Sequence, residues 1–245
     1  MKITLLFSLE NNKLPADYRR SFLSYFKNAL STSQPEKYEQ WYGKGKTVQK
    51  PFCFDIYLDH PKFLKDCVEI AEPMLKVTVS TADPMEAIDL YNCFLSQKHK
   101  SYPLAFDNTM TLDKIRIDNV KSITDDVILV KMMQPLVLRQ HDKDTNKDRY
   151  ITYEDNDFSD KFHEIVNAQL TSAGIQPDDS LQIIPIKPRR TVVKVMGGKF
   201  PANIGLYQLI GKPEILDYLY QSGTGSRNSA GLGVFEVVDA KKELQ

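Results

Sequence analysis

The apolar positions in the first half of the chain change spacing from segment to segment. Four short apolar runs, each bounded by polar residues, predict strands at residues 2–9, 51–58, 75–81 and 112–120. Apolar residues at helical spacing predict helices over residues 16–31 and 83–95. The resulting order, strand–helix–strand–strand–helix–strand, is typical of a split βαβ, or ferredoxin-like, unit.

Local signals between these elements refine the prediction. Asp83 is a suitable N-cap, Pro84 suits the first helical position, and Glu86 completes a capping box. Residues 33–50 are polar and contain glycine and lysine, so we predict a loop there.

The second half of the chain repeats the theme. Helical spacing predicts helices at residues 158–170 and 213–220. Strands are predicted at residues 127–138, where Pro135 interrupts the pattern, and at residues 149–153, 180–186, 191–196 and 232–238. With a boundary near residues 121–126, the prediction is an α+β protein of tandem ferredoxin-like (RRM-like, β-α-β-β-α-β) domains, residues 1–122 and 123–245.

Composition narrows the function classes. The 245 residues are 42% hydrophobic and 26% charged, which suits a globular protein with a sizeable core. The 32 basic and 32 acidic residues balance, so a globally basic nucleic-acid binder is excluded but a locally basic face is not. No apolar run is long enough to cross a bilayer, and an odd number of cysteines, 3, argues against a disulfide framework or a cysteine-rich zinc site. We expect a cytoplasmic protein without a metal site.

Residues 223–233 form a glycine-rich segment that ends at a predicted strand. Its glycines would let the backbone approach a phosphate chain, while its polar side chains supply hydrogen-bond donors. Neither the spacing of a nucleotide-binding P-loop nor that of a dinucleotide fingerprint is present. The alternative is a flexible hairpin loop. The candidate RNA contacts here are Gly223, Gly225, Ser226, Arg227, Asn228, Ser229, Gly231 and Gly233.

A basic stretch precedes this segment. No acidic residue occurs between Ser180 and Pro213. The stretch therefore predicts a cationic surface for an anionic ligand, unless it is simply a solvated face. Its candidate RNA-binding residues are Lys187, Arg189, Arg190 and Lys194.

The pattern G-x-G-x-R-N-S-x-G-L-G before a terminal strand resembles the glycine-rich loop of the CRISPR repeat-processing endoribonucleases of the RAMP superfamily. The stretch Ile186-Lys187-Pro188-Arg189-Arg190 and the segment Lys50-Pro51-Phe52 are similar as well, so the resemblance covers nearly the whole chain. It implies two ferredoxin-like domains and CRISPR repeat RNA as the partner, with other CRISPR effector proteins as further partners and a monomer or homodimer as the assembly.

The resemblance also implies an activity. Such enzymes cleave CRISPR precursor RNA within the repeat without metal or cofactor, by 2′-OH attack that leaves a 2′,3′-cyclic phosphate. The family usually carries a histidine in the loop after the first helix, but none of the 4 histidines of this chain lies in residues 31–50. Tyr42 stands at the expected place, beside Trp41.

Three residues are therefore candidates for catalysis. We assign Tyr42 as acid or base, Lys50 as phosphate stabiliser and, more weakly, Lys27, which occupies a helix position where the family often carries tyrosine. A tyrosine has an ordinary pKa of about 10, so a basic role requires a nearby cation such as Lys44, Lys46 or Lys50. The alternatives are that Tyr42 and Trp41 only pack the loop, and that the protein is a noncatalytic repeat RNA-binding protein of the same fold.

Residues 144–155 resemble a calcium loop, and a calcium-responsive or protein-interaction domain is a third hypothesis. Arg149 replaces the usual glycine, and no helix is predicted to enter the loop. We therefore predict a polar hairpin turn at this position.

Overall fold

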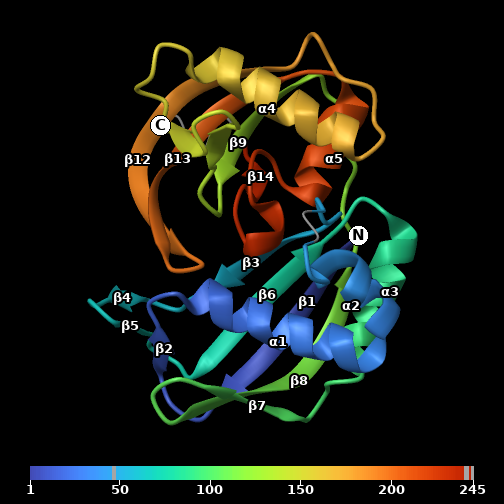
Figure 1. The fold of residues 1–245 in the computed structure, drawn as a ribbon, viewed down its shortest axis with the longest axis vertical. Helices are drawn as coiled ribbons and strands as arrows, with labels where there is room; N and C mark the ends of the chain where they lie inside the picture. Colours follow the sequence, from blue (N-terminus) through green and yellow to red (C-terminus); the bar gives the residue numbers. More distant parts are fainter. Residues whose placement is uncertain (46–47, 240–242, 244–245) are drawn as a thin grey trace. The chain divides into compact units, whose positions relative to one another are not determined.

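The computed structural model describes residues 1–45, 48–239 and 243, and it divides into two compact units. The first contains Met1–Val120 together with Lys194–Gly198, and the second contains Lys121–Val193 and the chain from Lys199 onward. Both combine helices with antiparallel sheets, so the fold is α+β (Figure 1). Among the described residues, no helix is both long and apolar enough to cross a membrane.

The first unit is built on a 5-stranded sheet in the order β3-β6-β1-β8-β7. A smaller 3-stranded sheet has the order β2-β5-β4. The elements are β1 (Lys2–Leu9), β2 (Lys13–Pro15), α1 (Tyr18–Ser33), α2 (Pro35–Tyr42), β3 (Cys53–Tyr57), β4 (Lys62–Phe63), β5 (Cys67–Glu69), β6 (Met74–Ser80), α3 (Pro84–Leu95), β7 (Ser101–Leu104) and β8 (Asn108–Asp118).

Aromatic packing joins the helices of this unit to the sheet. On α1, Phe22 lies 4.8 Å from Phe54 of β3, ring centre to ring centre, and Tyr25 lies 5.2 Å from Phe7 of β1. Phe26 of α1 also contacts Phe94 of α3 at 5.5 Å. These rings remove a large apolar area from water, which is the main stabilising contribution to such a core.

Both helices predicted for the first half are confirmed as α1 and α3. The Asp83 side chain accepts hydrogen bonds from the backbone amides of Met85 and Glu86, as the predicted cap requires. The prediction of a loop throughout residues 33–50 is wrong, because residues 35–42 form the helix α2. Trp41 is its only buried residue, so a helix this short shows no clear apolar periodicity.

The second unit is built on a 4-stranded sheet in the order β12-β13-β9-β14. Its elements are β9 (Val127–Met132), β10 (Leu138–Asp142), β11 (Lys147–Ile151), α4 (Phe158–Ser172), β12 (Gln182–Val195), β13 (Gly198–Ile210), α5 (Pro213–Ser222), the 3-10 turn η1 (Asn228–Ala230) and β14 (Phe235–Val237). Side chains of α4, α5 and the sheet form one buried core that includes Phe162, Leu216 and Phe235.

Two strand predictions in this half need correction. The segments 180–186 and 191–196 are one continuous strand, β12, despite Pro185 and Pro188. Since β12 is an edge strand, residues without a backbone N–H are tolerated there. The predicted strand 127–138 instead ends at Met132, and β10 begins at Leu138 after the interruption at Pro135.

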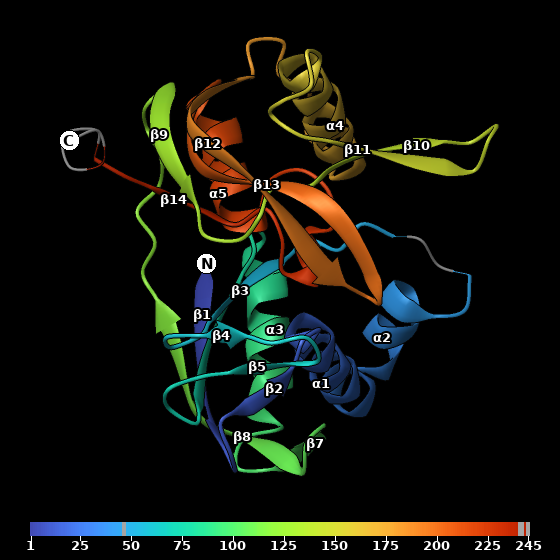
Figure 2. The ribbon, with the colours of Figure 1, turned by 90° about the vertical axis from the view of Figure 1, so that its left-hand side faces the viewer.

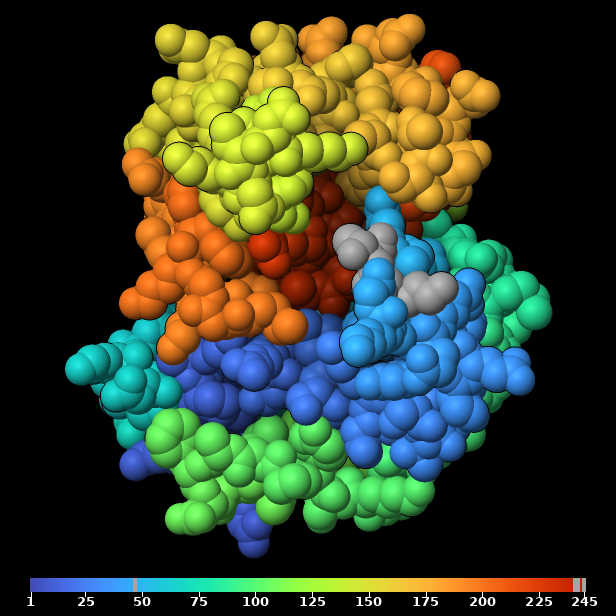
Figure 3. Space-filling model, viewed as in Figure 1, coloured from blue at the N-terminus to red at the C-terminus, as the bar shows by residue number. Residues whose placement is uncertain are grey.

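The predicted polar hairpin turn is confirmed. Strands β10 and β11 pair antiparallel from Leu138 opposite Ile151 to Asp142 opposite Lys147. The hairpin extends from its unit as a narrow ribbon (Figure 2). The side chains toward its tip are exposed, whereas Leu138 and Ile151 at its base are buried in the core. In the space-filling view it lies on the surface (Figure 3). Asp142 accepts hydrogen bonds from the amides of Asp144 and Thr145, so its carboxylate holds the turn.

Candidate functional site

The first unit brings the three predicted catalytic residues together. Tyr42 is the last residue of α2, Lys27 lies on α1, and Lys50 precedes β3. The Lys27 Nζ lies 4.5 Å from the centre of the Tyr42 ring, and the Lys50 Nζ lies 4.7 Å from it. Two ammonium groups therefore contact one aromatic ring, an arrangement stabilised by cation–π attraction. We call these three residues the tyrosine cluster.

Aromatic neighbours hold this cluster in place. Trp41 stacks on Phe52 with ring centres 5.5 Å apart, and Phe26 packs against Phe52 at 5.0 Å. The Tyr42 ring contacts Phe26 at 6.5 Å in an edge-on arrangement. Trp41 thus has the packing role considered above, and it fixes the end of α2 from which Tyr42 projects.

The Tyr42 hydroxyl is buried and has no hydrogen-bond partner among the described residues. Burial raises the pKa of Tyr42 well above its usual value, and the nearby Tyr38 and Cys93 act in the same direction. The lowered pKa that a basic role for Tyr42 would require is therefore not found. Burial disfavours the phenolate, so at neutral pH the hydroxyl is protonated.

Lys50 and Lys27 have no ion pair with a carboxylate in the described part of the chain. The Lys50 ammonium donates to the Val48 carbonyl at 3.0 Å. Burial, together with the charge of Lys27, lowers the pKa of Lys50. Lys37 on α2 differs, since it bonds the carboxylates of Glu86, at 2.7 Å, and Asp89. Two close cations without a carboxylate favour the binding of an anion.

Of the other two lysines considered as cations for Tyr42, Lys44 is exposed. Lys46 lies outside the residues that the structure describes.

The glycine-rich segment of the second unit uses most of its amides internally. The Gly225 amide donates to the Gln169 side chain at 3.1 Å, and the Ser226 amide donates to the Val137 carbonyl at 2.8 Å. The amides of Gly231 and Gly233 donate to the carbonyls of Asn228 and Pro135, each at 2.9 Å. These four amides are bonded within the protein and do not point to a ligand. The expectation that the glycines let backbone amides contact a phosphate chain is therefore wrong for these positions.

Close backbone packing explains the glycines better. At Gly233, φ is +70° and an added Cβ would lie 2.0 Å from the Thr224 carbonyl oxygen, so only glycine fits. Gly223 also has a positive φ, and its carbonyl accepts a hydrogen bond from the Gln169 side chain at 2.8 Å. The segment is therefore an internally bonded loop that presents side chains.

The most distinctive of these side chains is Arg227. Its guanidinium lies 5.0 Å from the centre of the Phe200 ring and donates to the Tyr150 hydroxyl at 3.3 Å. The Tyr150 and Phe200 rings stack at 4.8 Å with an interplanar angle of 6°. Arg227 Nε is buried without a partner among the described residues, although buried polar groups are usually hydrogen-bonded. Sequence reasoning missed Tyr150 and Phe200, because no local signal links these distant positions.

The remaining polar residues of the segment differ in environment. The Ser226 hydroxyl accepts a hydrogen bond from the Arg139 amide at 3.2 Å. Asn228 is buried, and its Oδ1 has no partner in the described chain. Ser229 is half-buried. Ser226 therefore has a structural role, while Arg227 and Asn228 keep unused polar atoms.

The four candidate RNA-binding residues of the basic stretch have different surroundings. Lys187 and Arg189 line an open pocket of the second unit with Lys131. Arg190 instead forms an ion pair with Glu154 at 3.1 Å. Lys194 lies near the end of β12, in the segment that groups with the first unit.

Comparison with known proteins gives matches of two kinds. Residues 118–237 match the family model for the C-terminal part of the CRISPR-associated protein Cas6. No curated protein matches the sequence.

Solved structures match the full chain at low identity. A structure described as a RAMP protein binding different RNA substrates is 17% identical, with a TM-score of 0.82, and the match covers 98% of this chain and 100% of the other. A Cas6-related protein from Pyrococcus furiosus is also 17% identical, with a TM-score of 0.83 over 98% and 99% of the chains. A CRISPR-associated protein Cas6 is 15% identical, with a TM-score of 0.76 and the same coverage.

In fold, the full chain is similar to these RAMP and Cas6 structures. By its match to the family model, the part of the chain from residue 118 to residue 237 belongs to the Cas6 family of CRISPR-associated proteins.

Proposed function

We propose that this protein is a metal-independent endoribonuclease that cleaves CRISPR precursor RNA within the repeat and so produces mature guide RNAs. The observation that carries the proposal is the tyrosine cluster, in which Lys27 and Lys50 contact the ring of Tyr42. The protonated tyrosine, whose ring contacts two ammonium groups without a carboxylate partner among the described residues, suits a phosphodiester whose negative charge grows during reaction.

The proposed reaction is an in-line transfer at phosphorus. The ribose 2′-oxygen attacks the adjacent phosphorus and loses its proton to water, while the bond from phosphorus to the 5′-oxygen breaks. The products are a 2′,3′-cyclic phosphate and a 5′-hydroxyl. Lys27 and Lys50 stabilise the charge on the phosphoryl oxygens, and Tyr42 donates its proton to the departing 5′-oxygen. The protein supplies positioning, charge and one proton.

RNA binding in this proposal uses the second unit as well. Arg227, held by Tyr150 and Phe200, has a buried Nε without a partner among the described residues, and Lys187 and Arg189 line an open basic pocket. Arginine is well suited to phosphate because its planar donors match two oxygens at once. CRISPR repeat RNA as the ligand implies a cytoplasmic protein, with other CRISPR effector proteins as its further partners.

We also infer that the two halves are ferredoxin-like domains, residues 1–122 and 123–245. The main strands of the first unit lie in the order β3-β6-β1-β8, and those of the second in the order β12-β13-β9-β14. If the four main strands of each unit are numbered along the chain, both sheets have the order 2-3-1-4. Helices follow the first main strand (α1 and α2 in the first unit, α4 in the second), and one helix follows the third (α3 and α5), as in a split βαβ unit.

A noncatalytic repeat RNA-binding protein is the second candidate, because no histidine is present at the expected place and the Tyr42 hydroxyl cannot act as a base at neutral pH. Incubation of labelled repeat RNA with the protein in EDTA separates the two. Discrete cleavage that Tyr42→Phe slows and that Tyr57→Phe, at an exposed position on β3, leaves unchanged supports the endoribonuclease. A mobility shift without cleavage supports the binding protein, and neither result would contradict both.

A further inference from the structure

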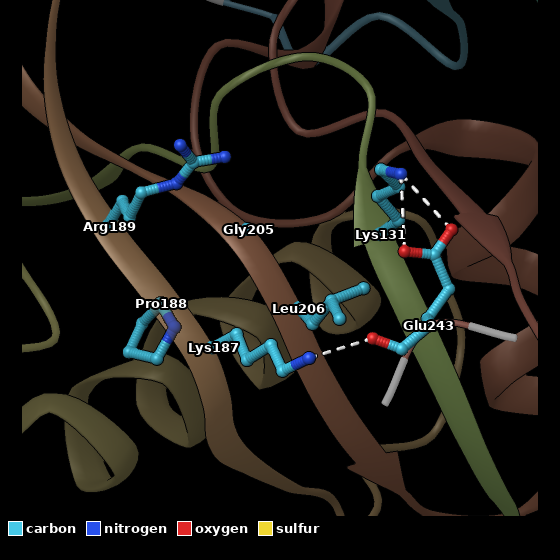
Figure 4. A pocket seen from close by; sticks show the side chains of 7 residues that line it. All are labelled: Lys131, Lys187, Pro188, Arg189, Gly205, Leu206 and Glu243. Atoms are coloured by element: carbon cyan, nitrogen blue, oxygen red, sulfur yellow. Dashed lines mark hydrogen bonds and ion pairs between the residues drawn. The ribbon is translucent and has the colours of Figure 1, made fainter. Parts of the chain in front are cut away.

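An acidic residue near the end of the chain lies in the basic pocket of the second unit (Figure 4). The pocket has a volume of about 410 Å³. Strands β9, β12 and β13 supply its walls, and Glu243 reaches it from beyond β14. Its principal lining residues are Lys131, Lys187, Arg189, Gly205, Leu206 and Glu243.

Glu243 offers oxygen atoms to both lysines of the pocket. The Lys131 ammonium donates to the two carboxylate oxygens at 3.1 and 3.3 Å. The Lys187 ammonium donates to the Glu243 backbone carbonyl at 2.9 Å. One residue thus places three oxygens, two of them sharing a negative charge, where the pocket's donors meet. A phosphodiester group presents oxygens of the same kind.

The pocket keeps an excess of positive charge even with Glu243 in place. Three of its residues are cations and one is an anion, and the Arg189 side chain has no ion pair or hydrogen bond with another described residue. Its shape depends on Gly205, where φ is +107° and an added Cβ would lie 2.2 Å from the Lys187 carbonyl oxygen. That glycine lets β13 pass close to β12 beside the two basic side chains.

We propose that this pocket binds a backbone phosphate of RNA and that Glu243 occupies it as a competitor when RNA is absent. The inference rests on the proposed function for the identity of the ligand as RNA. The ion pair is accessible to water, since the side chains of Lys131 and Glu243 are 48% and 30% exposed. An accessible ion pair has little net strength, so a phosphate group can replace the carboxylate.

The test measures RNA affinity in a variant that keeps the shape of Glu243 but removes its charge. Glu243→Gln should tighten binding of labelled repeat RNA about two- to fivefold at low salt, because a competing accessible ion pair is lost. The gain should shrink as salt rises, since salt screens exposed charges. The matched control is Glu214→Gln, which removes the same charge from an exposed position on α5 outside the pocket.

A double-mutant cycle shows whether the effect passes through the pocket. Lys131→Ala should weaken binding, and Glu243→Gln should have no further effect in the Lys131→Ala protein. An equal effect of Glu214→Gln, or a Glu243→Gln gain that persists without Lys131, overturns the proposal. The proposal is also overturned if the unmodified protein binds neither the repeat RNA nor a labelled oligouridylate.

The same measurements distinguish this proposal from the proposed function. If competition by Glu243 is present but the parent never cleaves RNA, the pocket assignment stands and the endoribonuclease proposal fails. If cleavage depends on the tyrosine cluster but Glu243→Gln matches its control, only the pocket assignment fails.

Discussion

The basic residues of the tyrosine cluster differ from Arg149 and Arg190 of the second unit in what surrounds them. Lys27 and Lys50 contact an aromatic ring and have no carboxylate partner among the described residues. In the second unit, Arg149 bonds Asp157 at 2.6 Å and Arg190 bonds Glu154 at 3.1 Å. An incoming phosphate gains the whole attraction of an unpaired cation, but it must displace a carboxylate from a paired one. Partners therefore decide which positive charges serve a ligand.

The largest effect should come from removing the unpaired cations. We expect Lys27→Ala and Lys50→Ala each to lower the single-turnover cleavage rate about 100- to 1000-fold, because each removes charge stabilisation at the phosphate. RNA affinity should change much less. Quenched-flow or gel assays with saturating protein measure the rate, and Lys44→Ala is the control for an exposed lysine of the same segment. Equal rates for parent and both cluster variants would place the chemistry elsewhere.

A smaller effect is expected when the proton donor is lost. Tyr42→Phe keeps the ring that contacts Lys27 and Lys50 and should slow cleavage about 10- to 100-fold, the usual contribution of one general acid. Tyr57→Phe removes a hydroxyl from an exposed position on β3 of the same unit and should leave the rate unchanged. If both variants cleave like the parent, the tyrosine has only a packing role.

Binding should show the contrast between unpaired and paired arginines. Arg189→Ala and Arg227→Ala should each weaken RNA binding about tenfold. Each should also reduce the slope of log affinity against log salt concentration by about 1, the loss expected for one phosphate contact. Arg190→Ala should have a smaller effect, because its partner Glu154 already neutralises it. Fluorescence anisotropy over a range of salt concentrations measures both quantities. An Arg190→Ala loss as large as the other two would show that carboxylate partners do not matter.

The smallest expected effect is a shift in the pH dependence of cleavage, which tests the protonation states of the tyrosine cluster. Burial raises the pKa of Tyr42, so its acid form is complete throughout the neutral range. Because Lys50 has a lowered pKa, it should lose its charge first as pH rises, and cleavage should fall on the alkaline side. Lys50→Arg, which stays charged, should move that fall to higher pH. An inflection near pH 6.5, the usual histidine pKa, would instead indicate a histidine catalyst.

Much of the secondary structure was predictable because it depends on local spacing. The helices α1 and α3, the cap at Asp83 and the β10–β11 hairpin follow from apolar periodicity and turn residues. The helix α2 was missed because Trp41 is its only buried residue. The unbroken strand β12 was missed because its prolines are tolerated only at a sheet edge, and the position of a strand in a sheet is not a local property.

For the candidate site, the sequence by itself determined which residue types were present: Tyr42, lysines near it along the chain, and a glycine-rich segment carrying Arg227. Only the tertiary structure decided how they are used. It placed Lys27 and Lys50 against the Tyr42 ring, buried the hydroxyl, and bonded the glycine amides internally. It also paired Arg190 and left Arg189 without a partner in the described chain. Charge and pKa depend on distance and burial, and these arise from contacts between segments far apart in sequence.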